Sequence, residues 1–195
     1  MKKQLNLDMN FKYILLLIIP LLILLSCNND NIAYKPIGIF YTKYTIKTGA
    51  PRQGMLDTSS RGIIILKDEY IKGLKYLDKF EYIFVLYHFH EAKGWDNIVR
   101  PPESEHKFGL FATRSPRRPN PIGLSLIKLD SIRNNKLFVS NIDAFNGTPV
   151  LDIKPFLPTV DSEITFKNME AEVELGHHDE DFINDSLVKI FVKGE

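Results

Sequence analysis

Residues 108–129 read FGLFATRSPRRPNPIGLSLIKL, and this stretch decides the expected fold. Its centre holds prolines at positions 116, 119 and 121. Each proline fixes the backbone φ angle and removes an amide donor, so neither a helix interior nor a central strand fits there. Apolar, β-favouring runs flank the prolines at residues 108–113 and 122–129. The sequence therefore predicts two strands that hold a stiff loop between them.

Three arginines lie on this loop, Arg114, Arg117 and Arg118. A guanidinium group pairs well with the oxygens of a carboxylate or a phosphate. The loop thus suits an anionic or carboxylate-bearing ligand. The alternative is a proline-rich surface connection whose arginines are simply solvated.

Four further segments accompany the loop in a collinear order. They are residues 51–54 (PRQG), 90–91 (HE), 99–102 (VRPP) and 146–158 (NGTPVLDIKPFLP). Together with the loop they resemble the signature of the TsaA-like, or TrmO-type, family. The resemblance runs from residue 34 to residue 160.

Members of that family are S-adenosylmethionine-dependent methyltransferases that modify N6 of the threonylcarbamoylated adenosine beside the tRNA anticodon. The resemblance implies this activity, S-adenosyl-L-methionine as cofactor, tRNA as partner, and a homodimer with the pocket near the subunit contact. The whole chain has a net charge of +1, but residues 27–160 carry about +6. A basic core suits an anionic partner, although such a surplus also occurs in domains that never meet nucleic acid.

Short β-favouring segments dominate the chain and predict a mainly β, α+β domain. A turn is expected at Asn134 and Asn135, and a helix over residues 69–77, where Tyr70, Leu74 and Leu77 share one face. The resemblance implies a small single-sheeted β-barrel methyltransferase fold with short helices, not a Rossmann-like one, and no GxGxxG turn occurs. The expected strands are residues 36–44, 61–66, 82–90, 108–113, 122–132 and 136–142.

S-adenosylmethionine needs a few convergent polar groups in an otherwise apolar pocket. Arg114 can pair with its carboxylate or with a tRNA phosphate, Gln53 and His90 can bond its ribose or adenine, and Leu124 can pack on the adenine. The resemblance implies eleven cofactor-binding positions: Pro51, Arg52, Gln53, His90, Glu91, Arg114, Leu124, Asn146, Gly147, Thr148 and Pro149.

Each position also has a structural alternative. His90 fits a hydrogen-bonded strand histidine, Leu124 an ordinary core residue, and residues 146–149 a plain turn. Two positions depart from the family pattern, since Asn146 replaces an aspartate and Glu91 stands where glutamine is common. The loss of the carboxylate at Asn146 predicts weakened or altered cofactor binding.

Methyl transfer to nitrogen is an in-line displacement, so catalysis rests on positioning and on removal of the N6 proton. Asp152, His90 and Tyr87 are possible proton acceptors, and Asp152 fits equally well as a residue that orients a lysine or caps a turn. The catalytic residue is therefore left unassigned. The expected substrate-binding residues are Arg117, Arg118, Asn120 and Lys154.

The N-terminus has the pattern of a secretory signal. Three lysines precede an apolar run at residues 13–25, which ends in Leu-Leu-Ser-Cys at Cys27, a sequence that resembles a lipoprotein lipobox. A run of about 13 residues is short for a membrane span, which needs about 20. We expect cleavage and acylation at Cys27. As the only cysteine, it excludes internal disulfides, and a buried or incidental thiol is the alternative.

The chain therefore divides into a signal peptide (1–26), a tether (27–33), a TsaA-like domain (34–160) and an acidic extension (161–195). The extension has ten acidic residues against three lysines, which disfavours contact with phosphate. A His-His-Asp-Glu-Asp cluster at 177–181 invites a metal site, but adjacent residues of a strand point in opposite directions, and no metal is expected.

The leader and the domain motifs point to different compartments. A processed lipoprotein is anchored outside the cytoplasm, where tRNA and S-adenosylmethionine are absent. One hypothesis is a tRNA methyltransferase; a second is a lipid-anchored extracytoplasmic binding protein that keeps the fold. A cytoplasmic enzyme held by an unprocessed leader is a third, which the short apolar run and Pro20 disfavour.

Overall fold

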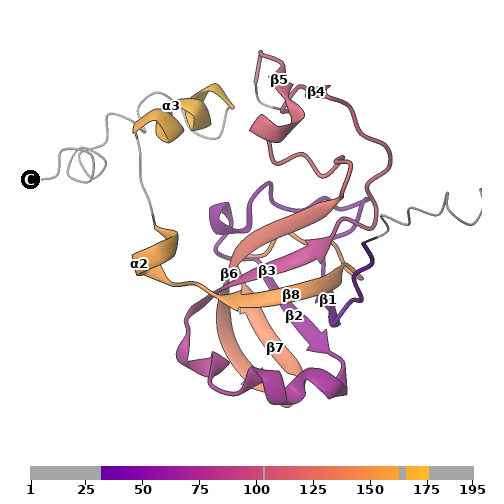
Figure 1. The fold of residues 1–195 in the computed structure, drawn as a ribbon, viewed down its shortest axis with the longest axis vertical. Helices are drawn as coiled ribbons and strands as arrows, with labels where there is room; N and C mark the ends of the chain where they lie inside the picture. Colours follow the sequence, from indigo (N-terminus) through magenta and orange to yellow (C-terminus); the bar gives the residue numbers. More distant parts are fainter. Residues whose placement is uncertain (1–31, 103, 163–165, 176–195) are drawn as a thin grey trace, which may run out of the picture. The chain divides into compact units, whose positions relative to one another are not determined.

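The computed structural model describes residues 32–102, 104–162 and 166–175. The described residues from Lys35 onward belong to one compact unit. This unit is built on a closed antiparallel barrel with the strand order β1-β2-β7-β6-β3-β8 (Figure 1). This confirms the expected single-sheeted β-barrel. The barrel strands are β1 Gly38–Thr42, β2 Arg61–Leu66, β3 Tyr82–His88, β6 Ile122–Arg133, β7 Lys136–Ser140 and β8 Pro149–Pro155.

Apolar side chains fill the barrel because its strands alternate between buried and more exposed positions. In β3 and β6, Ile83, Val85 and Ile127 point inward and are fully buried. Burial of each such side chain stabilises the fold by about 1.5–3 kcal/mol. The two-residue turn between β6 and β7 is the one expected at Asn134 and Asn135, and Asn134 has the positive φ of 54° that such turns need.

The helix expected over residues 69–77 is confirmed only in part. The chain forms two 3-10 helices instead, η2 Asp68–Leu74 and η3 Leu77–Lys79, separated at Tyr76, which has a φ of 68°. A left-handed residue breaks the helical hydrogen-bond ladder, so the apolar spacing cannot continue as one helix. Leu74 and Leu77 still pack against the barrel core.

The strand expected over residues 108–113 is also mostly wrong. Only β5 Phe108–Gly109 is extended, paired with β4 Ile98–Val99, and the 3-10 helix η4 Leu110–Ala112 follows it. Local bonds favour the turn, since both the backbone N–H and the Oγ1 of Thr113 donate to the carbonyl of Leu110 (3.1 and 2.9 Å). The proline loop thus lies between a helical turn and β6.

Strand β8 was not anticipated, because its residues were interpreted only as part of the 146–158 motif. It pairs with β1 on one side and β3 on the other, and so closes the barrel. Three expected strands also end early, β1 at Thr42, β3 at His88 and β7 at Ser140. The positive φ of Asn141, 59°, ends the last of these.

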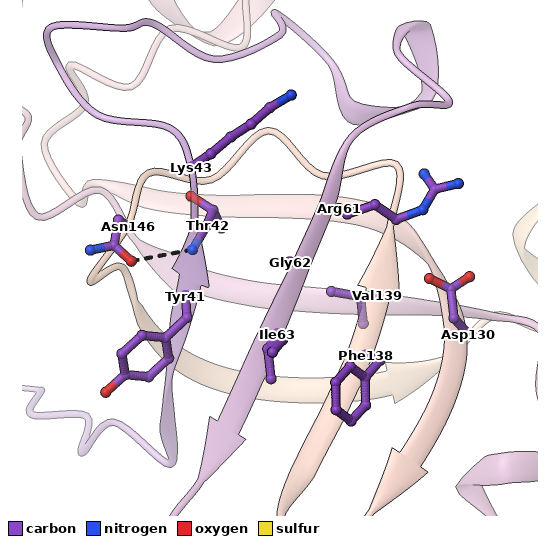
Figure 2. A pocket seen from close by; sticks show the side chains of 10 residues that line it. All are labelled: Tyr41, Thr42, Lys43, Arg61, Gly62, Ile63, Asp130, Phe138, Val139 and Asn146. Atoms are coloured by element: carbon purple, nitrogen blue, oxygen red, sulfur yellow. Dashed lines mark hydrogen bonds between the residues drawn. The ribbon is translucent and has the colours of Figure 1, made fainter.

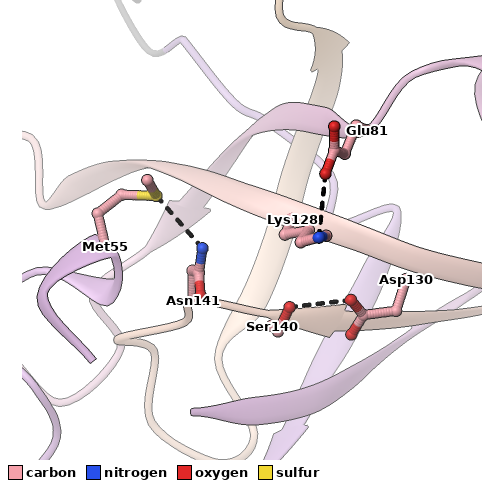
Figure 3. Close-up of polar contacts among 6 residues, drawn as sticks. All are labelled: Met55, Glu81, Lys128, Asp130, Ser140 and Asn141. Carbon is pink, nitrogen blue, oxygen red and sulfur yellow. Dashed lines mark hydrogen bonds and ion pairs between the residues drawn. The ribbon is translucent and has the colours of Figure 1, made fainter. Parts of the chain in front are cut away.

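The 3-10 helix η1 Gly54–Leu56 is held against the end of β7. Asn141 donates from Nδ2 to the Met55 sulfur at 3.5 Å, and its neighbour Ser140 donates from Oγ to Asp130 at 2.9 Å (Figure 3). Ser60 anchors the same backbone, because its carbonyl accepts from Asn141 N–H and its Oγ from Ile142 N–H. The described part of the extension contains α2 Pro158–Asp161 and α3 Phe166–Glu174.

Gly54→Ala is expected to destabilise the fold. A Cβ at this position would lie 1.9 Å from the carbonyl oxygen of Asn141, in a backbone segment that Ser60 holds in place. We expect the free energy of unfolding, measured by chemical denaturation, to fall by about 1–3 kcal/mol. Gly73→Ala is the matched control, since a Cβ there meets no atom within 4 Å. Equal stabilities of the two variants would contradict this packing.

Candidate functional site

Two of the sequence motifs meet at Gln53 and Arg114. The Nη1 of Arg114 donates a hydrogen bond to Oε1 of Gln53, although 61 residues separate them in the chain. The Nε2 of Gln53 in turn donates to the carbonyl of Arg52 at 2.8 Å. The exposed guanidinium has five N–H donors, so most of them can bind an anionic ligand. The structure thus joins the 51–54 segment to the proline loop.

Two more motifs meet at His90. Its Nδ1 lies 3.3 Å from Oγ1 of Thr148, and its Nε2 lies 3.5 Å from Oε1 of Glu91. Gly147 has a φ of 82°, and a Cβ added there would lie 3.9 Å from Nε2 of His90. Glycine at this position leaves the edge of the imidazole uncovered. It is also the residue that adopts this positive φ most readily.

Asn146 connects this region to the end of β1. Its Oδ1 accepts from the backbone N–H of Thr42 at 3.2 Å, and its own N–H donates to the carbonyl of Tyr44 at 2.8 Å. An amide oxygen can serve as this acceptor as well as a carboxylate can, so the replacement of aspartate keeps the local backbone bond. Pro149 follows within β8, opposite Ile39.

A polar cluster that was not predicted from the sequence lies inside the same end of the barrel. Ser125 Oγ donates to Oδ1 of Asp143 at 2.7 Å, and the Tyr87 hydroxyl lies 3.0 Å from Ser125 Oγ and 3.4 Å from Asp143 Oδ1. The signal was available in part, because Tyr87 occupies an inward position of β3, and a buried tyrosine hydroxyl needs a partner.

Burial controls the titration of this cluster. It raises the pKa of Asp143 above the ordinary 3.8, against the opposing effect of hydrogen bonds from Ser125, Tyr87 and the backbone N–H of Gly54. It also raises the pKa of Tyr87, a rise that the Asp143 carboxylate strengthens and the Arg114 charge weakens. Tyr87 is therefore a neutral hydrogen-bonding group. A role for Tyr87 as the proton acceptor is disfavoured.

A family profile described as the tRNA-methyltransferase O N-terminal domain matches residues 39–162. This chain belongs to that family. A probable S-adenosyl-L-methionine-binding protein of Pyrococcus abyssi is 40% identical over 130 residues, which cover 67% of this chain and 71% of the archaeal protein. The tRNA (adenine(37)-N6)-methyltransferase of Escherichia coli is 37% identical over 143 residues, 68% of this chain and 61% of that protein.

Two solved structures agree with the fold. A crystal structure of TrmO has a TM-score of 0.59 and 35% identity, with 68% of this chain and 61% of that chain covered. The TrmO of Pseudomonas aeruginosa has the same TM-score at 32% identity and is covered over 59% of its length. This chain therefore spans about three fifths of these family members and of the bacterial enzyme.

Leu124 is an expected cofactor residue that the structure places on the surface. It sits on the outer side of β6, 56% exposed, whereas its neighbour Ser125 points inward to Asp143. Successive side chains of a strand point to opposite faces, so Leu124 cannot reach the buried cluster. Its contact with adenine stays a prediction, and the idea that it is an ordinary core residue is wrong.

The expected substrate residues have differing surroundings. Arg118 donates from Nη1 to the carbonyl of Thr113 at 2.9 Å and lies over the Phe111 ring, so it braces the proline loop. Arg117 and Asn120 are exposed on that loop. Lys154 pairs with Asp152 at 2.6 Å, which agrees with a lysine-orienting role for Asp152. Substrate binding by Arg117, Arg118, Asn120 and Lys154 remains a prediction.

Residues 32–102, 104–162 and 166–175 contain no group of three or more His, Cys, Asp or Glu placed to hold a metal ion. The described helices include none long and apolar enough to span a bilayer. Cys27 and the 177–181 cluster lie outside the described residues.

Asp143→Asn is expected to change how stability depends on pH. The raised pKa means that the ionised carboxyl is less favourable in the folded chain than in the unfolded one. The wild-type chain should therefore lose stability relative to Asp143→Asn as the pH rises from below the ordinary aspartate pKa through the raised value. Above that range the difference should be constant.

Denaturant titrations at a series of pH values measure this difference. Ser125→Ala serves as the companion variant, because it removes a hydrogen bond that lowers the Asp143 pKa. Its loss of stability should extend to higher pH than in the wild-type chain. Parallel pH profiles for the wild-type and Asp143→Asn chains would contradict the proposed burial of the carboxyl.

Proposed function

We propose that this protein is an S-adenosylmethionine-dependent methyltransferase that modifies tRNA. The observation that carries the proposal is the meeting of separate family motifs at one end of the barrel, through the Arg114–Gln53 and His90–Thr148 contacts. The names of the relatives support it, since they include an S-adenosyl-L-methionine-binding protein and a tRNA (adenine(37)-N6)-methyltransferase.

The donor set fits this cofactor. The Arg114 guanidinium can take the methionine carboxylate in a two-bond pair, and Gln53 holds that guanidinium in position. His90 lies beside Gly147, which has no side chain, and its imidazole could bond a ribose or adenine edge. When bound, the cofactor would supply the methyl group from its sulfonium.

The chain's own contribution would be mainly positioning. An in-line displacement needs the acceptor nitrogen aligned with the methyl donor, and fixed polar groups provide that alignment. The Tyr87–Ser125–Asp143 cluster would support this alignment from inside the barrel, because Asp143 interacts with the backbone of Gly54, which belongs to the 51–54 segment. We further propose N6 of threonylcarbamoyladenosine beside the anticodon as the acceptor, and a homodimer as the working form.

Arg114→Ala is expected to abolish most cofactor binding with little effect on folding. A hydrogen bond to a charged group contributes about 1.5–3 kcal/mol, so the Kd for S-adenosylmethionine should rise about 10- to 150-fold. Arg117→Ala, on the same loop but without the bond to Gln53, should bind within about twofold of the wild-type chain, as for most surface substitutions.

Calorimetric titration with S-adenosylmethionine, with S-adenosylhomocysteine as the companion ligand, tests both variants. Unfolding curves recorded alongside show whether each variant is folded. Equal affinities of Arg114→Ala and the wild-type chain would remove the role assigned to this loop. No binding by the wild-type chain at millimolar ligand would overturn the methyltransferase proposal.

A second proposed function rests on the leader. The lipobox-like Leu-Leu-Ser-Cys sequence supports acylation of Cys27 and membrane attachment outside the cytoplasm, where the domain would serve as a binding module without tRNA methylation. If the leader is unprocessed, the domain would instead be cytoplasmic.

Cys27→Ser separates the two. If Cys27 is acylated, the wild-type chain should incorporate a palmitate analogue and fractionate with membranes, and Cys27→Ser should do neither. Labelling in bacteria followed by in-gel detection measures the first, and immunoblots of membrane and soluble fractions the second. An unlabelled wild-type chain would rule out the lipoprotein proposal.

A further inference from the structure

An open groove lies on the outer face of β1, β2 and β7 (Figure 2). Tyr41, Ile63 and Phe138 form its floor, and the strand register puts them side by side, with Tyr41 opposite Ile63 and Ile63 opposite Phe138. The groove has a volume of about 550 Å³, within the range of about 300–1,000 Å³ typical of small-ligand sites. Tyr41 is 49% exposed, so its ring is open to a ligand.

Polar and charged side chains surround this apolar row. Lys43 and Arg61 lie beyond Tyr41 and Ile63 at one end of the groove, and Asp130 lies beside Phe138 (Figure 2). The Arg133 guanidinium lies 5.4 Å from the Phe138 ring centre. Three cations thus surround the floor against one carboxylate, and that carboxylate already accepts from Ser140. The balance of charge favours an anionic ligand.

The chemistry of the groove matches single-stranded RNA better than a lipid or a second copy of the chain. Unpaired bases stack on aromatic side chains, and sheets that present such rings beside cations are a common RNA-binding surface. Asn146 and Asp130 add amide and carboxylate groups that can bond base edges or a ribose hydroxyl. The apolar floor consists of only three side chains and is bordered by charged groups. A lipid or protein contact would need a larger apolar area.

Asn146 also places the groove beside the candidate cofactor site. It lines the groove, and its backbone continues directly into Gly147 and Thr148 next to His90. A nucleotide chain whose target base lay at the cofactor would therefore have a neighbouring base within reach of the groove.

We propose that this groove binds an unpaired base of the RNA substrate next to the one that is methylated. The base stacks on Tyr41, while Lys43 and Arg61 contact the adjoining phosphates. This proposal rests on the proposed tRNA substrate and adds a second recognition site to it.

Fluorescence anisotropy of the full-length chain tests the proposal. The probe is a labelled RNA hairpin with the sequence of a tRNA anticodon stem and loop. Tyr41→Ala removes the stacking contact with one base, so its Kd for the hairpin should rise about 5- to 150-fold. Tyr41→Phe keeps the ring and should bind like the wild-type chain. Tyr76→Ala is the matched control, because Tyr76 is 58% exposed between Lys75 and Lys79 but lies outside the groove.

Calorimetry with S-adenosylmethionine, run on the same variants, separates this proposal from the first. Wild-type cofactor affinity in Tyr41→Ala together with weakened RNA binding would support the groove. Unchanged RNA binding in Tyr41→Ala, or an equal loss in Tyr76→Ala, would overturn it and leave the cofactor site standing. A wild-type chain that binds cofactor but not the hairpin would also overturn it, and one that binds neither would overturn both proposals.

Discussion

Closure of the barrel by the pairing of β8 with β1 is the constraint on which the rest of the structure depends. The pairing sets Gly38 opposite Val150, and backbone bonds continue it as Gly147 N–H donates to Phe40 O. Residues 146–149 are thereby fixed against the end of β1. His90 follows β3, which pairs with the other edge of β8, and contacts Thr148. Without this closure the motifs would be separate loops with no common site.

The barrel interior is apolar through most of its length and polar at one end. Among the residues that the structure describes, fourteen buried apolar and aromatic side chains form the core cluster, whereas Ser125 and Asp143 join Tyr87 in hydrogen bonds where the motifs meet. A largely buried carboxyl is costly unless it is hydrogen-bonded, and the hydroxyls of Ser125 and Tyr87 provide those bonds. In many proteins, as here, polar groups that reduce stability lie close to the functional residues.

Local chemistry made the proline loop, the β6–β7 turn and the mainly β class predictable, whereas the barrel was implied by the family resemblance. Prolines exclude regular structure wherever they occur, and Asn134 accepts a positive φ at little cost. Strand β8 was harder, since its prolines at both ends, Pro149 and Pro155, read as loop signals. The single helix predicted over residues 69–77 does not form, because apolar spacing alone does not reveal the left-handed backbone at Tyr76.

The candidate site was also predictable only in part. Its motif residues could be named in advance from the resemblance, but their pairings could not, because Gln53 and Arg114 are 61 residues apart and Tyr87 and Ser125 are 38 apart. Asp143 carries no local signal at all. Such contacts become visible only once the register of the closed sheet is known.

The same closure has a consequence for how the protein is made. Thr42 bonds to Asn146, 104 residues later in the chain, and contacts between such distant residues form late because a long loop must first be ordered. During synthesis the first strand must wait, with its pairing edge open, until β8 has left the ribosome. That open edge is an aggregation liability until β8 pairs with it, and residues 146–149 are the last motif to join the candidate site.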